Sequence, residues 1–361
     1  MAQVVPHQLL INLSFLADKP TGHTVYANSL LPHLRSLDPI LLTSQIFPDD
    51  RCYPIPPHLT PDRGGKGHLS RLLWTQFELP NLYKKLKGSL LFSPIPEAPL
   101  FTKIRHVVTL HDLIPLRFLK RFSPRTPYFK HYIPHVLSQA EQIICDSQAT
   151  AQDAMSFFNI SAKKMTVIPL AYDAEHFRYL DLPTQNYFLY LGRHDAYKNL
   201  GRAIEAFSKL PDRASYEFLI AGPTDDRYTP TLVNLVTQLG LTERVKFLSY
   251  VPYSELPTLL NQAIALVFPS LWEGFGLPVL EAMACGTPVI TSNLSSMPEV
   301  AGEAALLVDP YDVEAIADAM HQISRDPTLR SQLHQLSLDR ASHFSWAKTA
   351  AATADVLSQY L

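Results

Sequence analysis

The chain has 361 residues, 47% of them hydrophobic, which is enough apolar surface for the cores of two domains. No apolar run approaches the ~20 residues of a membrane-spanning helix, so the sequence predicts no such span. The formal net charge of -2 is uneven, because residues 1–170 carry +7 and the remainder carries -9. Three widely separated cysteines lack metal-ligand spacing, so we expect reduced thiols in a cytoplasmic protein: Cys52, Cys145 and Cys285.

The first half alternates short apolar runs with amphipathic segments. We predict strands at residues 9–15, 40–46, 89–92, 107–110, 143–145 and 166–169. Helical patterns lie between several of them, at residues 25–34, 70–77 and 128–140. Such alternation is typical of βαβ units in a parallel sheet. The first run lacks a basic leader and is interrupted by Asn12 and Ser14, which favours a strand over a signal peptide.

The second half repeats the alternation at intervals too uneven for a solenoid. Its predicted strands are residues 187–191, 217–221, 245–248, 265–268, 289–291 and 305–308. Polar and proline residues interrupt the pattern at 171–183, where we place the boundary between domains at 1–170 and 171–345. The sequence therefore predicts an α/β chain with two Rossmann-like, doubly wound domains and a helical end beyond residue 326.

The most informative segment covers residues 269–300, directly after a buried apolar run. In its loop, Gly274 and Gly276 flank Phe275, so the backbone can approach a ligand closely and adopt dihedral angles that other residues avoid. A helix follows this loop. Helix N-termini behind glycine loops attract phosphate groups, because their free amides point at the ligand.

The start and end of that helix are both marked in the sequence. Pro278 suits the beginning of a helix predicted over residues 279–285, and Gly286 suits its C-terminal cap. Glu273 lies in the loop before the helix, whereas Glu281 lies about one turn into it. We therefore expect the two carboxylates to face different parts of one elongated ligand.

Further polar side chains follow other strands. Arg193 and Lys198 come after the strand at residues 187–191, where cations would stabilise the charge of a departing diphosphate. His111 ends the strand at residues 107–110, and its imidazole is expected either to bond a sugar hydroxyl or to pair with a carboxylate. Asp112 either orients His111 or closes the turn.

These motifs resemble those of the family 4 (group 1) retaining glycosyltransferases of the GT-B fold. The match is densest in residues 269–300, where Glu273 and Glu281 are separated by seven residues, as in the family signature. The resemblance implies that residues 1–170 bind the acceptor and residues 171–345 bind the nucleotide sugar. It also implies that a final helix, residues 346–361, returns to the first domain.

The resemblance assigns a role to each candidate residue. Glu273 and the amides of residues 275–277 would hold the sugar, and Glu281 would hold the ribose hydroxyls. Arg193 and Lys198 would bind the diphosphate, and His111 would support the sugar near the developing oxocarbenium. The implied catalytic residues are His111, Arg193, Lys198 and Glu273, and the implied substrate-binding residues are Gly22, Val251, Gly274, Phe275, Gly276, Leu277 and Glu281.

Gly22 and Val251 lie in two further loops that resemble those of the family. Gly22 belongs to a loop like the family's glycine loop, although Gly22-His23 departs from the Gly-Gly or Gly-Ile found there. The Val251 backbone would lie beside the nucleobase, whose identity does not follow from the sequence. Lys19 and Pro20 precede Gly22 in the same loop.

The implied reaction is the transfer of a hexose from a UDP- or GDP-sugar to a hydroxyl acceptor, with retention and without cofactor. No Asp-x-Asp occurs in the chain, which favours a metal-independent site. The acceptor is left open among lipid-linked, oligosaccharide and small-molecule hydroxyls. An epimerase, a sugar phosphorylase and a non-catalytic nucleotide-sugar-binding relative remain alternatives, whereas a dehydrogenase is disfavoured because no Gly-x-Gly-x-x-Gly follows a strand.

Residues 63–130 form a basic segment with 13 basic and three acidic residues. It suits a phosphate-bearing acceptor or reversible association with an anionic membrane, and nucleic acid is not expected because no binding motif accompanies the charge. A solvated basic face remains the alternative. The apolar and basic residues that would form an interfacial face are Arg71, Leu72, Leu73, Trp74, Phe77, Leu79, Leu82, Lys84, Lys85 and Lys87.

Overall fold

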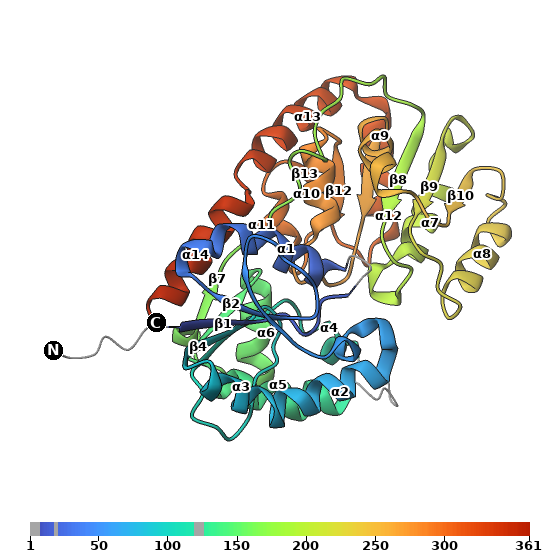
Figure 1. The fold of residues 1–361 in the computed structure, drawn as a ribbon. Coiled ribbons are helices and arrows are strands. Elements are labelled where there is room, and N and C mark those ends of the chain that lie inside the picture. Colours follow the sequence, from blue (N-terminus) through green and yellow to red (C-terminus); the bar gives the residue numbers. More distant parts are fainter. Residues whose placement is uncertain (1–7, 18–20, 119–125) are drawn as a thin grey trace. The chain divides into compact units, whose positions relative to one another are not determined.

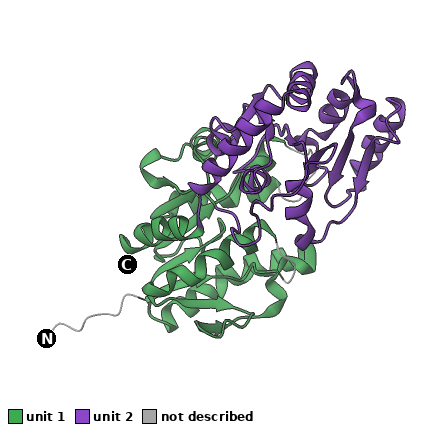
Figure 2. Cartoon of the chain, turned by 90° about the horizontal axis from the view of Figure 1, so that it is seen from above, with its two compact units in different colours: residues 1–170, 346–361 green, residues 171–345 purple. Residues whose placement is uncertain are grey.

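The computed structural model describes residues 8–17, 21–118 and 126–361, and the chain forms two compact units. Unit 1 comprises residues 1–170 and 346–361, and unit 2 comprises residues 171–345 (Figure 2). Helix α14 (Trp346–Ser358) therefore belongs to unit 1, where it packs on α1 (Gly22–Leu34). Among the described residues, no helix combines the length and apolar character needed to cross a bilayer.

The described part of unit 1 contains one parallel sheet with strand order β3-β2-β1-β4-β5-β6-β7. Figure 1 labels strands β1, β2, β4 and β7 of this sheet. The strands are β1 (Gln8–Asn12), β2 (Ile40–Thr43), β3 (Arg51–Pro54), β4 (Gly88–Ser93), β5 (His106–Leu110), β6 (Gln142–Cys145) and β7 (Met165–Val167). The central strands are buried on both faces, which explains their continuous apolar sequence.

Helices cover this sheet and complete two apolar clusters. Trp74 and Leu79 pack with Leu10, Leu42 and Leu91 from β1, β2 and β4 in one cluster. The other cluster joins α5 and α6 to β5 and β6. Besides α1 and α14, the helices of this unit are α2 (Gly64–Phe77), α3 (Leu79–Lys85), α4 (Ile114–Arg117), α5 (Ile133–Gln139) and α6 (Gln148–Phe158).

Unit 2 also has a parallel sheet, with strand order β10-β9-β8-β11-β12-β13. The strands are β8 (Tyr187–Leu191), β9 (Glu217–Ala221), β10 (Val245–Leu248), β11 (Ala265–Phe268), β12 (Val289–Ser292) and β13 (Ala305–Val308). The helices are α7 (Leu200–Ser208), α8 (Thr229–Gln238), α9 (Leu256–Asn261), α10 (Leu277–Ala284), α11 (Met297–Ala301), α12 (Val313–Arg325) and α13 (Pro327–Ser342).

Both sheets are doubly wound. In each sheet the second and third strands of the sequence follow one another on one side of the first strand, and the fourth strand pairs with the first on its other side. The strand order therefore reverses between β1 and β4 in unit 1 and between β8 and β11 in unit 2. Ligands of such sheets bind beyond the carboxyl ends of the strands at these reversals. The predicted pair of Rossmann-like sheets is confirmed.

Candidate active site

The loop between β11 and α10 is fixed by backbone geometry. Gly276 has a φ of +111°, and a Cβ at this position would lie 2.3 Å from the Cε atom of Met297. A side chain there would be strained and would also clash. Helix α10 begins at Leu277, with Pro278 in its first turn, and Gly286 follows its end with a φ of +73°. Both predicted boundaries of this helix are therefore close to the observed ones.

Two serines that the sequence analysis missed hold Glu273 in this loop. The backbone N–H of Glu273 donates to Ser295 Oγ at 3.0 Å, and its carbonyl accepts from Ser295 Oγ at 2.5 Å. Ser296 Oγ reaches the carbonyls of Glu273 at 3.1 Å and Phe275 at 2.8 Å. Serines shortly after a strand are too common for sequence alone to assign this role. These bonds hold the loop at three backbone atoms, which belong to Glu273 and Phe275.

The side chains of Lys198 and Glu273 meet at the strand reversal of unit 2. Lys198 Nζ lies 2.7 Å from Oε1 and 2.9 Å from Oε2 of Glu273. Their side chains are only 13% and 9% exposed, and Nζ also lies 5.1 Å above the ring of Phe268. The structure thus unites two predicted site residues from loops 75 positions apart. Each charge offsets the burial cost of the other.

Arg193 lies in the same loop as Lys198, but its side chain pairs with Asp195 and not with Glu273. Its Nε lies 3.0 Å from Asp195 Oδ2, and its side chain is 65% exposed. Arg227, which the sequence analysis missed, approaches Asp195 at 3.6 Å and also pairs with Asp225. Among the described residues, the structure shows no hydrogen bond between Arg193 and the Lys198–Glu273 pair. Arg193 therefore offers an accessible guanidinium for a phosphate.

Glu281 lies in a contrasting environment on α10. Burial and the neighbouring Asp173 raise the pKa of its carboxyl to about 7. No hydrogen bond or ion pair to its carboxyl is seen within the described residues. Near it, the rings of His176 and Tyr253 stack at 3.8 Å, and the Tyr253 hydroxyl lies 3.4 Å from Asp173 Oδ2. This carboxyl is thus available to accept from a ligand hydroxyl.

Three other predicted donor-site positions belong to backbone segments. Val251 is half-buried between β10 and the short turn Tyr253–Glu255. Gly274 lies in the loop already described. Gly22 is the first residue of α1, directly after the capping Thr21, and a Cβ there would touch no described residue. Lys19 and Pro20 of that loop lie outside the described residues.

In unit 1, His111 pairs with a carboxylate that the sequence did not indicate. His111 Nδ1 lies 2.7 Å from Asp146 Oδ2, and Nε2 lies 2.9 Å from the carbonyl oxygen of Pro94. Asp112 instead accepts from the backbone N–H of Ile114 at 2.9 Å and so closes the turn. Asp146 follows β6, and His111 follows the neighbouring strand β5. The order of the strands was therefore the one signal that could have indicated this pair.

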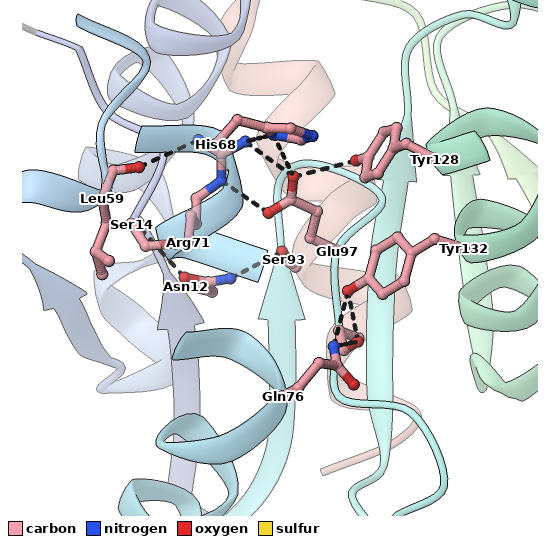
Figure 3. Close-up of polar contacts among 11 residues, drawn as sticks. Asn12, Ser14, Leu59, His68, Arg71, Gln76, Ser93, Glu97, Tyr128 and Tyr132 are labelled. Carbon is pink, nitrogen blue, oxygen red and sulfur yellow. Dashed lines mark hydrogen bonds and ion pairs between the residues drawn. The ribbon is translucent and has the colours of Figure 1, made fainter. Parts of the chain in front are cut away.

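A second buried network occupies unit 1 (Figure 3). Arg71 donates to Glu97 through Nε at 2.8 Å and Nη2 at 2.9 Å, and the Tyr128 hydroxyl donates to Glu97 at 3.1 Å. Asn12 and Ser93 bond each other at the strand reversal between β1 and β4. The expectation that Arg71 contributes to a basic surface is wrong, because its charge is buried and paired.

The predicted interfacial face also changes in the structure. Trp74 and Leu79 are core residues at 7% and 0% exposure, so they do not belong to a surface. The exposed face of α2 instead carries Leu69, Leu73 and Phe77, at 58%, 51% and 68% exposure. Residues 119–125 of the basic segment lie outside the described residues.

Sequence comparison places both halves of the chain in known families. Residues 20–176 match the model described as "Glycosyltransferase Family 4", and residues 172–337 match "Glycosyl transferases group 1". The chain is 32% identical over 266 residues to O-antigen chain mannosyltransferase B of Escherichia coli, covering 69% of each chain. It is 28% identical over 338 residues to O-antigen chain mannosyltransferase RfbU of Salmonella typhimurium, covering 90% of this chain and 94% of that one.

A further relative is much longer than this protein. The serotype-specific mannosyltransferase WbdA of Escherichia coli is 31% identical over 274 residues. The match covers 71% of this chain but only 33% of the length of WbdA.

Solved structures share the fold at low sequence identity. Sucrose-phosphate synthase from Thermosynechococcus elongatus superposes with a TM-score of 0.78 at 20% identity, covering 98% of both chains. Anabaena HepE in complex with UDP and glucose gives a TM-score of 0.75 at 18% identity, covering 98% of this chain and all of that one. This likeness and the two doubly wound units show the GT-B fold. The two family matches and the relative at 32% identity show that the chain belongs to the group 1 glycosyltransferases of family 4.

Proposed function

We propose that the protein is a retaining, metal-independent hexosyltransferase that uses a UDP- or GDP-sugar as its donor. The buried Lys198–Glu273 pair at the strand reversal of unit 2 carries this proposal. The pair lies in loops beside the N-terminus of α10, where backbone amides suit a phosphate. Mannose is the first sugar to test, because relatives at about 30% identity are named mannosyltransferases.

The charges of unit 2 suit a departing nucleoside diphosphate. As the glycosidic bond breaks, the leaving phosphate gains negative charge, which positioned cations stabilise without a metal. Arg193 has an exposed side chain, whereas Lys198 is held against Glu273. Glu281, which pairs with no cation of the described residues, would accept hydrogen bonds from the ribose hydroxyls, and the Val251 backbone would lie beside the base.

The ion pair also bears on the route of the acceptor proton. Both carboxylate oxygens of Glu273 accept from Lys198, so an acceptor hydroxyl would compete with this ammonium group for them. In the mechanism that we propose, an oxygen of the donor phosphate takes the proton while the acceptor attacks from the side that the nucleotide leaves. Unit 1 would bind the acceptor, whether lipid-linked, oligosaccharide or small molecule.

We also propose reversible association of unit 1 with an anionic membrane at the cytoplasmic side. Leu69, Leu73 and Phe77 recur every four residues on α2, so they share one exposed face. Lys84 and Lys85 end the next helix, and basic residues near an anionic surface contribute about 1 kcal/mol each. The cysteines are unpaired thiols, as expected in the cytoplasm.

A donor screen with product analysis tests the proposed activity. Thermal shift with a panel of nucleotide sugars would identify the donor, and mass spectrometry would then identify products formed with and without acceptor. A transferase forms a new glycosidic bond only with an acceptor present. Conversion of the donor sugar without any acceptor would instead show an epimerase, and a requirement for inorganic phosphate would show a phosphorylase.

Arg193→Ala is the sharpest variant for this screen. Its side chain is 65% exposed, so the substitution should leave the fold intact. Loss of one preorganised electrostatic contact should lower turnover at least ~100-fold. Arg213→Ala, which removes an exposed arginine from a turn of the same unit, is the matched control. Equal activity of the two variants would show that Arg193 does not bind the diphosphate.

A further inference from the structure

Three neighbouring strands of unit 1 converge on the His111 imidazole. Pro94, His111 and Asp146 follow β4, β5 and β6, which lie side by side in the sheet. The ring is held on both sides, with Nδ1 2.7 Å from the Asp146 carboxylate and Nε2 2.9 Å from the Pro94 carbonyl. The side chains of His111 and Asp146 are 11% and 3% exposed. Water therefore has little access to either group.

These partners determine the number of protons on the ring. The Pro94 carbonyl can only accept a hydrogen bond, so Nε2 must carry a proton. At 2.7 Å, a proton must lie between Nδ1 and Asp146 Oδ2, because two facing lone pairs would repel each other. Burial raises the pKa of Asp146 and favours this proton on the carboxyl, whereas the neighbouring His111 opposes that shift. With the proton on Nδ1, the contact is a charge-assisted hydrogen bond between an imidazolium and a carboxylate, and the pair is neutral overall.

The surroundings of the pair support the same protonation state. Burial is the largest influence and opposes the charge on His111, but the Asp146 carboxylate, the Pro94 carbonyl and Asp112 together raise the pKa of His111 above its usual value. From α1, His23 stacks on the ring at 4.7 Å and Tyr26 meets it edge-on at 4.8 Å.

The other oxygen of Asp146 has no hydrogen-bond partner in the described part of the chain. Oδ1 is buried and accepts no hydrogen bond from any described residue. The proton on His111 Nδ1 is therefore the main stabilising contact of this carboxylate, and a neutral ring would leave the carboxylate buried without compensation. Each member of the pair depends on the charge of the other.

We propose that Asp146 is a positioning residue that keeps His111 protonated on both ring nitrogens at neutral pH and so excludes it as the base that takes the acceptor proton. The proposal rests on the function proposed above for the same chain. Without a lone pair, His111 cannot take the proton of the acceptor hydroxyl. It can act near the sugar only through its shape and charge, so the acceptor proton must go to another base.

Nuclear magnetic resonance of the full chain labelled with ¹⁵N-histidine tests the protonation state directly. Comparison with His111→Gln assigns the ring signals. At pH 7.5 both nitrogens of His111 should be protonated, and the signals should not titrate between pH 6 and 8. A singly protonated ring, or titration near the ordinary pKa of 6.5, would overturn the proposal. Because no substrate is present, this result is independent of whether the protein transfers a sugar.

Asp146→Asn then tests the positioning role. The amide lacks the charge that holds the Nδ1 proton, so His111 should become singly protonated at pH 7.5. Transfer should fall at least ~10-fold, the scale of losing a partner that orients a histidine, while nucleotide affinity should be unchanged. The pH–rate profile of this variant should gain a dependence that the wild type lacks.

Asp153→Asn is the matched control, since Asp153 is an equally buried carboxylate of unit 1 that pairs with Arg117. It should leave the His111 signals and the pH–rate profile unchanged. If Asp146→Asn and Asp153→Asn behaved alike in both measurements, Asp146 would have only a structural role, and the proposal would be wrong.

Discussion

Two glutamates eight positions apart have opposite electrostatic environments. Glu273 is paired with Lys198 through both oxygens, whereas Glu281 faces Asp173 and has a pKa raised to about 7 by burial and by that neighbour. The first carboxylate is held in place by Lys198 in the free protein. The second is partly protonated at neutral pH, and a ligand that donates hydrogen bonds would favour its ionised form.

Replacement of Glu281 should reveal the cost of its ionisation. Its folded pKa of about 7 lies above the ordinary 4.5, so between these values the folded state binds more protons and stability falls as pH rises. The free energy of unfolding of Glu281→Gln should therefore equal that of the wild type below pH 4.5. At pH 8 it should be higher, by up to about 3 kcal/mol. Thermal unfolding across this range measures it.

The exposed Glu243→Gln provides the control for that experiment. It should show no such pH-dependent gain. A Glu281→Gln variant that lost stability at pH 8 would contradict the assigned environment.

The two glutamates should also differ in nucleotide binding. Glu281→Gln should weaken binding of the nucleoside diphosphate alone, because its proposed partner is the ribose. Glu273→Gln should leave that affinity nearly intact while it damages transfer, since its proposed partner is the sugar. Calorimetry beside single-turnover assays separates the effects. Equal loss of affinity in both variants would show that these roles are wrongly assigned.

At the scale of elements, the strands with apolar sequences were predictable and the edge strand was not. Twelve predicted strands correspond to observed ones, because strands buried between helices read as apolar runs. Strand β3 (Arg51–Pro54) was missed, since it lies at the sheet edge, is largely exposed and contains a proline. Similarly, the predicted helix at residues 128–140 begins with a π-helical turn at Tyr128–Tyr132.

The part of the candidate site that lies in one continuous segment of the sequence was predictable. The loop and helix around Glu273 and Glu281 follow from local glycine and proline signals. The roles of Asp146 and Ser295 could not be predicted from the sequence. Only the folded chain brings Asp146 next to His111 and Ser295 next to Glu273. The Lys198–Glu273 ion pair likewise joins two loops that the sequence shows separately.

A double-mutant cycle tests the coupling between those two loops. Lys198→Met or Glu273→Gln alone leaves a buried charge or polar group unpaired, so the lysine variant should lose about 3–5 kcal/mol of stability. The double variant should lose much less than the sum of the two losses. Urea unfolding measures all three. The exposed pair Lys246–Glu217 is the control, where coupling should not exceed ~1 kcal/mol.

Helix α2 allows a test of the proposed membrane surface. The double change Leu73→Ser and Phe77→Ser should abolish co-sedimentation with anionic vesicles at low salt, and salt should release the wild type. Tyr311→Ser removes an equally exposed apolar residue from unit 2 and should have no effect. If the wild type were absent from anionic and neutral pellets alike, the exposed face of α2 would have no membrane role.

At the scale of the whole molecule, each unit has its own doubly wound sheet and its own cluster of polar side chains at the strand ends. Unit 2 contains Glu273, Lys198 and Arg193 at one strand reversal, and unit 1 contains the His111–Asp146 pair. The halves also differ in charge, with +7 on residues 1–170 and -9 on the remainder. This division fits a protein whose two units bind different substrates.

The configuration of the product tests the central claim most directly. The donor identified by the screen would be incubated with protein, acceptor and excess chelator, and proton magnetic resonance would follow the anomeric proton of the first product formed. We predict transfer at nearly the rate without chelator, with the anomeric configuration of the donor retained. Inversion at the anomeric carbon, or loss of activity that Mg²⁺ or Mn²⁺ restores, would contradict a retaining, metal-independent transferase.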